Sequence, residues 1–323
     1  NVSCDILFID ECSTVSNKDM RQILEKAQFK LLVLVGDVYQ IESIYFGNWF
    51  SIAQMFIPNT SVFELTHPYR TTDDALLMVW DRVRKLNDSI LELLVKSGYV
   101  ARLDESIFER SGDDEIILCL NYDGLYGINN INRFLQSSNP NESITWGINT
   151  YKVGDPILFN ESNKFSPLIH NNSKGKIVAI KVEEQRISFH IELEEAINEI
   201  DAQGYDFELI GISQNGHSII SFSINKLRST DEDDDDNDST VVPFQVAYAV
   251  SIHKAQGLEY DSVKIVITNE TEERITHNIF YTAITRARKK LKIYWSPETE
   301  QSVLSRLEEK NNNKDAFLLS QLS

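Results

Sequence analysis

The strongest constraint on the fold is a run of apolar residues that passes directly into a polar turn containing glycine. Residues 247–252 are apolar at most positions, and residues 253–259 read His-Lys-Ala-Gln-Gly-Leu-Glu. The apolar run favours a buried strand, and functional loops of open α/β sheets lie at the carboxyl ends of strands. Gly257 allows a close backbone approach to a ligand or a positive φ. We therefore expect an α/β fold with this turn at a ligand site; the alternative is an ordinary surface loop.

Two stretches near the N-terminus are organised in the same way. Residues 7–12 read Leu-Phe-Ile-Asp-Glu-Cys, and residues 34–41 read Leu-Val-Gly-Asp-Val-Tyr-Gln-Ile. Each is an apolar run that ends in carboxylates or amides. Residues 279–290 are different, because they predict a helix whose apolar face is formed at helical spacing by Ile279, Ala283, Ile284 and Ala287. Arg286 lies among small residues there and not in a run of surface charge.

In this order the segments resemble the later motifs of the superfamily 1 helicases. Asp10-Glu11 resembles the Walker B motif, and Gly36-Asp37 with Gln40 resembles motif III. Tyr69-Arg70 resembles the next motif, and residues 253–259 and 281–287 resemble motifs V and VI. One such match would be weak, but five in the right order are highly specific.

Residues 123–136, 153–158 and 172–178 make the RecD-like enzymes the nearest resemblance. UvrD-like enzymes share motifs V and VI but usually carry a large helical insertion, where this chain has a small β-rich stretch. The resemblance implies RecA-like P-loop NTPase helicase domains, the first of them partial, with a small SH3-like β-barrel insertion.

Composition and motif order suggest the following division of the chain. Residues 1–112 would hold the end of the first RecA-like domain and connecting helices. The second RecA-like domain would combine 113–150 with 241–323, and 151–228 would be the inserted barrel. Residues 229–240 contain a block of like charge typical of a disordered loop.

Local patterns predict the first elements of this division. A capping box at residues 16–19 opens a helix to about Ala27. Strands are expected at 4–10, 31–35 and 61–65.

The resemblance also implies roles for individual residues. ATP hydrolysis needs a carboxylate near Mg²⁺ and one that polarises the attacking water, which would be Asp10 and Glu11. Gln40 would sense the γ-phosphate, and Arg70 and Arg286 would place positive charge on it. Taken without the resemblance, the carboxylates fit a polar strand end, Arg70 a salt bridge at a helix end, and Arg286 a capping contact.

In this interpretation, different residues of the turn at 253–259 contact two different ligands. Gly257 and Glu259 would contact nucleotide, with Glu259 toward the ribose. His253 and Lys254 would face the nucleic acid, although a structural His253 is an alternative. Base stacking by tryptophans is possible in such sites, but Trp49, Trp80 and Trp146 fit core packing better.

One family motif is absent from the sequence. No G-x-x-x-x-G-K-[ST] phosphate loop occurs in the 323 residues. We expect a C-terminal portion of a longer protein, whose N-terminal Walker A region completes the ATP site, and an isolated chain without activity. A complete protein that has lost ATP binding is the alternative.

Composition restricts how the chain can hold nucleic acid. Its 49 acidic and 31 basic residues give a net charge of −18, whereas nucleic-acid-binding domains are usually basic. A DNA site must therefore be a local groove that uses stacking and specific contacts. The sequence has no run of 18 apolar residues, so no membrane-spanning helix is predicted. Its three cysteines lack the spacing of a metal site, which fits a reducing cytoplasm.

These observations lead to one functional expectation and two rivals. We expect an ATP-dependent DNA helicase or translocase that uses ATP and Mg²⁺ and moves on single-stranded DNA, 5′→3′ by resemblance. The rivals are a non-catalytic nucleic-acid-binding or regulatory module, and an RNA-directed superfamily 1 helicase.

Overall fold

The structure is a computed structural model that describes residues 2–43, 47–66, 68–160, 165–226, 240–308 and 312–321. The chain forms two compact units, one of residues 1–120 with 251–323 and one of residues 121–250. These divisions do not test the domains predicted above, which stay predictions. The predicted acidic loop lies almost wholly outside the described residues.

The first unit begins with two small parallel ladders. β1 (Val2–Ser3) pairs with β3 (Ala27–Gln28), and β2 (Ile6–Ile9) pairs with β4 (Leu31–Leu34). The intervening α1 (Asn17–Lys26) starts at Ser16, whose hydroxyl accepts from the amide of Asp19 at 3.1 Å. The helix start predicted at Ser16 is thereby confirmed, and the unit opens with a β-α-β crossover.

The chain then continues through α2 (Trp49–Phe56) and a 3₁₀ turn at Asn59–Ser61. The strand predicted at 61–65 is wrong, because residues 62–66 have no regular structure. Phe63 and Leu65 are 84% and 89% exposed. A strand needs a neighbouring edge to pair with, and this stretch has none in the described part of the chain, so its apolar composition does not produce a ladder.

A second, parallel sheet forms the core of this unit. Four of its strands lie in the order β6-β16-β17-β5, and the neighbouring pairs among these four are parallel. The strands are β6 (Glu115–Cys119), β16 (Tyr260–Val266), β17 (Ala287–Tyr294) and β5 (Val100–Ala101). Ile116 to Cys119 are at most 1% exposed, as expected for a parallel strand covered on both faces.

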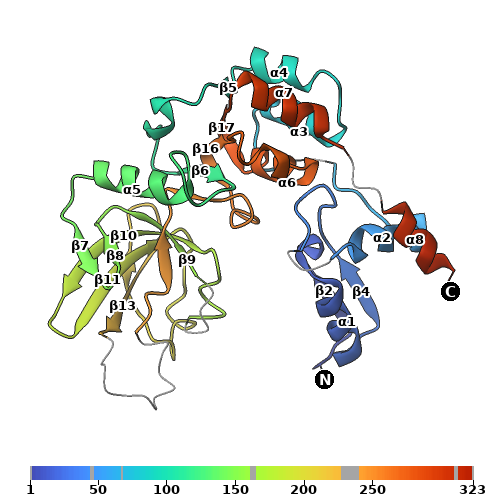
Figure 1. Ribbon diagram of the computed structural model, residues 1–323. Coiled ribbons are helices and arrows are strands. Elements are labelled where there is room, and N and C mark those ends of the chain that lie inside the picture. Colours follow the sequence, from blue (N-terminus) through green and yellow to red (C-terminus); the bar gives the residue numbers. More distant parts are fainter. Residues whose placement is uncertain are drawn as a thin grey trace. The chain divides into compact units, whose positions relative to one another are not determined.

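Helices gather around this sheet (Figure 1). Asp73 caps α3 through hydrogen bonds from two amides, and α4 ends before Gly98, which has φ 67°. The helices are α3 (Asp74–Arg84), α4 (Ile90–Lys96), α6 (His277–Ile284) and α7 (Pro297–Arg306). The mixed α/β fold with a parallel sheet that we predicted is therefore present.

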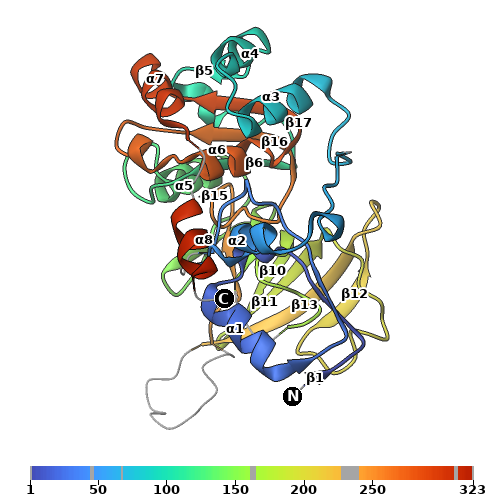
Figure 2. The same ribbon diagram turned by 90° about the vertical axis from the view of Figure 1, so that its right-hand side faces the viewer.

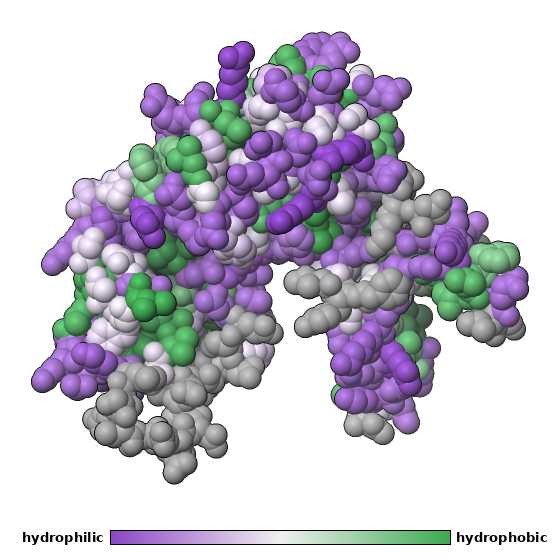
Figure 3. All heavy atoms as spheres, in the orientation of Figure 1, coloured by the Kyte–Doolittle hydropathy of each residue, from purple (hydrophilic) through white to green (hydrophobic). Residues whose placement is uncertain are grey.

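The unit ends with α8 (Asn313–Ser320), whose Asp315 accepts from the side chain of Asn48 at 2.7 Å. Figure 3 shows apolar side chains gathered over α8, at the right of the view. Phe317 is 63% exposed and Leu318 54% exposed. Among the described residues, no helix combines the length and apolar character that crossing a membrane requires.

The second unit contains α5 (Ile128–Ser138), a hairpin of β7 (Ile144–Trp146) and β8 (Asn149–Tyr151), and a six-stranded sheet (Figure 2). The sheet has the order β12-β13-β11-β10-β9-β14, and every pair is antiparallel. Its strands are β9 (Pro156–Phe159), β10 (Lys174–Val182), β11 (Arg186–Leu193), β12 (Glu208–Ile212), β13 (Ser218–Asn225) and β14 (Phe244–Val246). β15 (Ala249–Ser251) then returns the chain to the first unit.

Aromatic rings fill the interior of this sheet, where Phe189, Phe222 and Phe244 are 3% exposed or less. The carboxylate of Asp155 is buried in this unit, at 0% exposed. Its two oxygens accept from Gln136, Asn139, the amide of Lys152 and the hydroxyl of Tyr248 at 2.6–2.9 Å. The predicted β-rich stretch is thus a folded sheet, while its closure into an SH3-like barrel stays a prediction.

Candidate nucleotide site

The carboxylates predicted for metal and water follow the C-terminal end of β2. Asp10 Oδ1 accepts from the amide of Glu11 at 2.8 Å, and Glu11 has φ 51° and ψ 41°. A non-glycine residue in the left-handed region is uncommon and often marks a functional site. Although the Glu11 side chain keeps contact with solvent, partial burial followed by the charge of Asp10 raises the pKa of its carboxyl.

The end of β4 lies against the same place because Gly36 has no side chain. A Cβ at Gly36 would lie 2.9 Å from the Phe50 ring and 3.1 Å from the amide nitrogen of Cys12. That amide donates to Val35 O at 2.8 Å. Glycine is therefore required where the ends of β2 and β4 approach each other.

Residues 36–41, called the Gln40 loop below, follow β4. Asp37 Oδ1 accepts from the amide of Tyr39 at 2.9 Å, and Asp37 Oδ2 accepts from Gln40 Nε2 at 3.3 Å. The other end of the Gln40 amide, Oε1, accepts from Nη2 of Arg286 at 3.3 Å. Two of the predicted catalytic residues are therefore in contact, although 246 positions separate them in sequence.

Arg286 does not lie on a helix, so the helix predicted through 287 is wrong. α6 ends at Ile284, Thr285 is its C-cap, and Ala287 already begins β17. The Thr285 hydroxyl donates back to Tyr281 O at 2.9 Å, which satisfies a carbonyl of the last turn. Helical spacing of small residues could not reveal this end, because Ala287 is apolar in either element.

The guanidinium of Arg286 is fully buried, at 0% exposed. It donates to Thr282 O at 2.9 Å, Leu258 O at 3.1 Å, the Thr285 hydroxyl at 3.2 Å and Gln40. Burial, followed by the positive charge of Arg70, lowers the pKa of Arg286 to about 10. This side chain is thus a desolvated cation whose acceptors are neutral groups.

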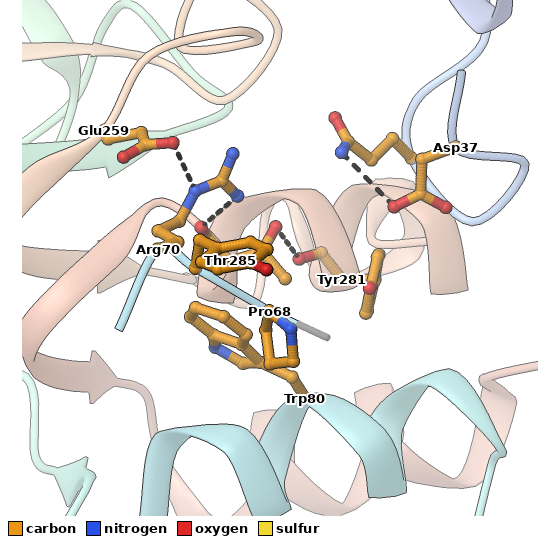
Figure 4. A pocket seen from close by; sticks show the side chains of 9 residues that line it. Asp37, Pro68, Arg70, Trp80, Glu259, Tyr281 and Thr285 are labelled. Atoms are coloured by element: carbon orange, nitrogen blue, oxygen red, sulfur yellow. Dashed lines mark hydrogen bonds and ion pairs between the residues drawn. The ribbon is translucent and has the colours of Figure 1, made fainter. Parts of the chain in front are cut away.

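Arg70 forms hydrogen bonds with two residues that lie in the segments before β16 and β17. Its Nε donates to Glu259 Oε1 at 2.5 Å, and its Nη1 donates to Thr285 O at 2.8 Å. Figure 4 shows Arg70 between Glu259 and Thr285, with Trp80 and Pro68 on another side of the same cavity. Arg70, which was predicted to contact the phosphate, and Glu259, which was predicted to contact the ribose, are therefore paired with each other.

A cavity of about 540 Å³ opens beside these residues. Gln40, Arg70 and Glu259 are the predicted site residues among its lining. The sequence did not predict that the other lining residues belong to the site. They are Asp37, Pro68, Tyr69, Trp80, Tyr281 and Thr285. Asp37, Tyr69, Tyr281 and Thr285 stand inside the motif matches, which was the available signal.

The remaining predicted residues lie in the turn after β15 and outside that lining. Gly257 has φ 75°, and no atom lies within 4 Å of a Cβ built there, so it serves the turn geometry. His253 and Lys254 are half-buried, and burial lowers the pKa of each side chain. Both are thus less disposed to carry charge than exposed residues of their type.

Comparisons with known proteins match this arrangement along the chain. Residues 2–105 match the family described as AAA domain, and residues 246–294 match the UvrD-like helicase C-terminal domain. The RecBCD enzyme subunit RecD of Mycolicibacterium smegmatis is 24% identical over 332 residues, which covers 94% of this chain and 52% of that protein. The predicted resemblance to the RecD-like helicases of superfamily 1 is confirmed.

Other RecD-like and related proteins agree with this placement. The ATP-dependent DNA helicase Pif1 of Campylobacter jejuni is 25% identical over 335 residues, covering 90% of this chain and 69% of that protein. A crystal structure of Pif1 helicase from Bacteroides, in complex with ADP-AlF3 and ssDNA, shares the fold with a TM-score of 0.56. It has 16% identity and covers 99% of this chain and 76% of that one. The chain spans about half the length of the RecD subunits that it matches over most of its own length.

Proposed function

We propose that this RecD-like chain is part of an ATP-dependent DNA helicase and that its cavity holds the nucleotide. One observation carries the proposal: Gln40 and Arg286 are in contact beside a cavity that Arg70 and Glu259 line. These side chains come from four separate segments of sequence. The cavity of about 540 Å³ has the size expected of a small-ligand site, roughly 300–1,000 Å³.

The phosphate end of the nucleotide would lie toward the two arginines. A terminal phosphate oxygen can replace the amide oxygen of Gln40 as an acceptor of Arg286, because an anion is a stronger acceptor than a neutral amide. Arg286 needs no further desolvation, so its charge is already placed where negative charge develops during phosphoryl transfer. Gln40 is then released from Arg286 and can report the presence of the γ-phosphate.

Mg²⁺ would be held by Asp10 together with the nucleotide phosphates. The described residues contain no cluster of three or more metal-ligating side chains, and Mg²⁺ is commonly bound by one or two carboxylates plus phosphates and water. Asp10 is exposed, and only Oδ1 accepts a hydrogen bond from the Glu11 amide, so the carboxylate fits this use. The bound ion would neutralise phosphate charge, while Glu11 would orient and deprotonate the attacking water.

The ribose would be read by Glu259, whose carboxylate can accept from a sugar hydroxyl. Its present partner is Arg70 at 2.5 Å, so nucleotide must compete with that ion pair for both residues. Arg70 is then available to the phosphates when Glu259 turns to the sugar. Gly257 supports this exchange by its turn geometry and not by a side chain.

Single-stranded DNA would contact the turn that holds His253 and Lys254. A net charge of −18 leaves little long-range attraction for a polyanion, so binding depends on local contacts. The 5′→3′ direction and an SH3-like insert follow from the RecD-like resemblance. The Walker A region of the same protein would supply the phosphate cradle, and the cytoplasm is the proposed location.

Strand separation by the full-length protein tests this function. Duplexes with a 5′ tail, a 3′ tail or no tail, each made in DNA and in RNA, would be incubated with ATP and Mg²⁺. The proposal predicts separation of the 5′-tailed DNA duplex, dependent on hydrolysable ATP. Binding of tailed DNA without ATP turnover would favour the non-catalytic module, and preference for the RNA duplexes would favour the RNA-directed rival.

A further inference from the structure

Three side chains outside the proposed catalytic set hold the main chain of the Gln40 loop. Asn278 Nδ2 donates to Gln40 O at 2.8 Å and to Val38 O at 3.2 Å. Gln256 Nε2 donates to Ile41 O at 2.8 Å, and the Ile41 amide donates to the Thr282 hydroxyl at 2.9 Å. We call Gln256, Asn278 and Thr282 the loop bracket.

The bracket replaces hydrogen bonds that an irregular segment cannot make within itself. Ile41 is 6% exposed, so its amide and carbonyl would otherwise lack partners, which native structures rarely tolerate. Thr282 and Asn278 belong to α6, and Gln256 belongs to the turn after β15. The loop is therefore fixed to two elements more than 200 positions away in sequence.

Side-chain packing holds the same loop from another direction. The Tyr39 ring lies edge-on to His277 and to Tyr281, with centroids 6.2 and 6.1 Å apart. Arg84 lies over the Tyr39 ring at 4.7 Å. With its main chain bracketed and Tyr39 packed, the loop has little freedom to move Gln40 by itself.

The orientation of Gln40 depends on this restraint. Its Oε1 accepts from Arg286 at 3.3 Å and its Nε2 donates to Asp37 at 3.3 Å. Both are long hydrogen bonds, so they contribute little to holding the loop in place. The shorter bonds of the bracket, at 2.8–2.9 Å, fix the main chain from which the Gln40 side chain projects.

We propose that Gln256 and Asn278 are positioning residues that transmit the nucleotide state of Gln40 to the turn at 253–259. The inference rests on the proposed function. When phosphate replaces Gln40 at Arg286, the loop would respond as one body with its neighbours, because Gln256 ties its main chain to the turn at 253–259 and Asn278 ties it to α6. Gln256 lies two residues after Lys254, so the same displacement reaches the side chains proposed to face DNA.

The test removes the donors without changing side-chain size greatly. In the full-length protein, Asn278→Asp and Gln256→Met each eliminate the side-chain donor to the loop carbonyls. We expect single-stranded DNA to stimulate ATP hydrolysis about tenfold less in each variant, with kcat reduced and nucleotide Kd within about threefold. Asn141→Asp is the matched control, because exposed Asn141 Nδ2 also donates to a carbonyl, Val153 O at 2.8 Å, and lies in the second unit.

A double-mutant cycle distinguishes positioning from general damage. If Asn278 acts through Gln40, then Asn278→Asp in a Gln40→Ala background causes almost no additional loss. Additive losses, or stimulation within twofold of wild type in both single variants, would overturn this inference alone. A wild-type protein that does not hydrolyse ATP would instead overturn the proposed function and the inference together.

Discussion

Arg286 Nη2 lies 3.3 Å from Gln40 Oε1, and this contact brings the last predicted motif against an early one. The guanidinium is buried and its acceptors are three carbonyl or amide oxygens and one hydroxyl. A buried cation is costly unless it is hydrogen-bonded or meets an anion. These hydrogen bonds therefore stabilise the buried charge, and the proposed phosphate would replace one of them.

Replacing Glu11 by glutamine should remove turnover and increase stability at neutral pH. Partial burial and the neighbouring Asp10 raise the pKa of Glu11 above its ordinary value of 4.5. The folded state then favours the protonated carboxyl, so Glu11 supports stability below pH 4.5 and this support is lost as pH rises through the raised pKa. Thermal melts at pH 4 and pH 7.5 should show a higher Tm for Glu11→Gln only at pH 7.5. A lower Tm at pH 7.5 would show that Glu11 has a structural role.

Glu259→Gln should weaken nucleotide binding more than it weakens the fold. The Arg70–Glu259 pair is partly exposed, with 26% and 36% of the side chains accessible, so it contributes at most about 1 kcal/mol to stability. Loss of the ribose acceptor should raise the Kd for ATP about tenfold, equivalent to about 1.4 kcal/mol. Calorimetric titration and urea unfolding of the same variant measure both quantities. Unchanged affinity would remove Glu259 from the proposed ribose contact.

Asp155→Ala should destabilise the second unit without affecting nucleotide binding. The carboxylate is 0% exposed and accepts from four donors, each of which loses this partner after truncation. We expect a loss of about 3 kcal/mol, visible as faster amide exchange in β9 and β10. Asp206→Asn is the control, because Asp206 is exposed. Protected strands in Asp155→Ala would show that packing of the aromatic core, and not this network, holds the unit.

Much of the fold was accessible from sequence because its signals are local. The capping box at Ser16 and the apolar run of β4 each specify their own element. The strand predicted at 61–65 fails for a physical reason, since an apolar run becomes a strand only beside an edge that accepts it. The end of α6 was missed because Ala287 is equally suited to helix and buried strand.

The site could be predicted only as separate motifs. Sequence order placed Gln40, Arg70, Glu259 and Arg286 in recognisable motifs, but it did not show which of these side chains would be in contact. Contacts such as Arg70 with Glu259 depend on how the loops are held together. The bracket residue Asn278 lies outside the five motifs recognised in the sequence, so none of them pointed to it.

The most direct measurement of the central claim is steady-state ATP hydrolysis, with single-stranded DNA, by full-length wild type, Arg286→Ala and Arg286→Lys. A side chain that stabilises phosphate charge mainly in the transition state affects kcat more than binding. We predict that kcat falls at least about 1,000-fold in Arg286→Ala, while nucleotide affinity stays within about an order of magnitude. Lysine should restore little, because it lacks the planar fork that binds phosphate oxygens. Near-normal kcat in a folded Arg286→Ala protein would contradict the account.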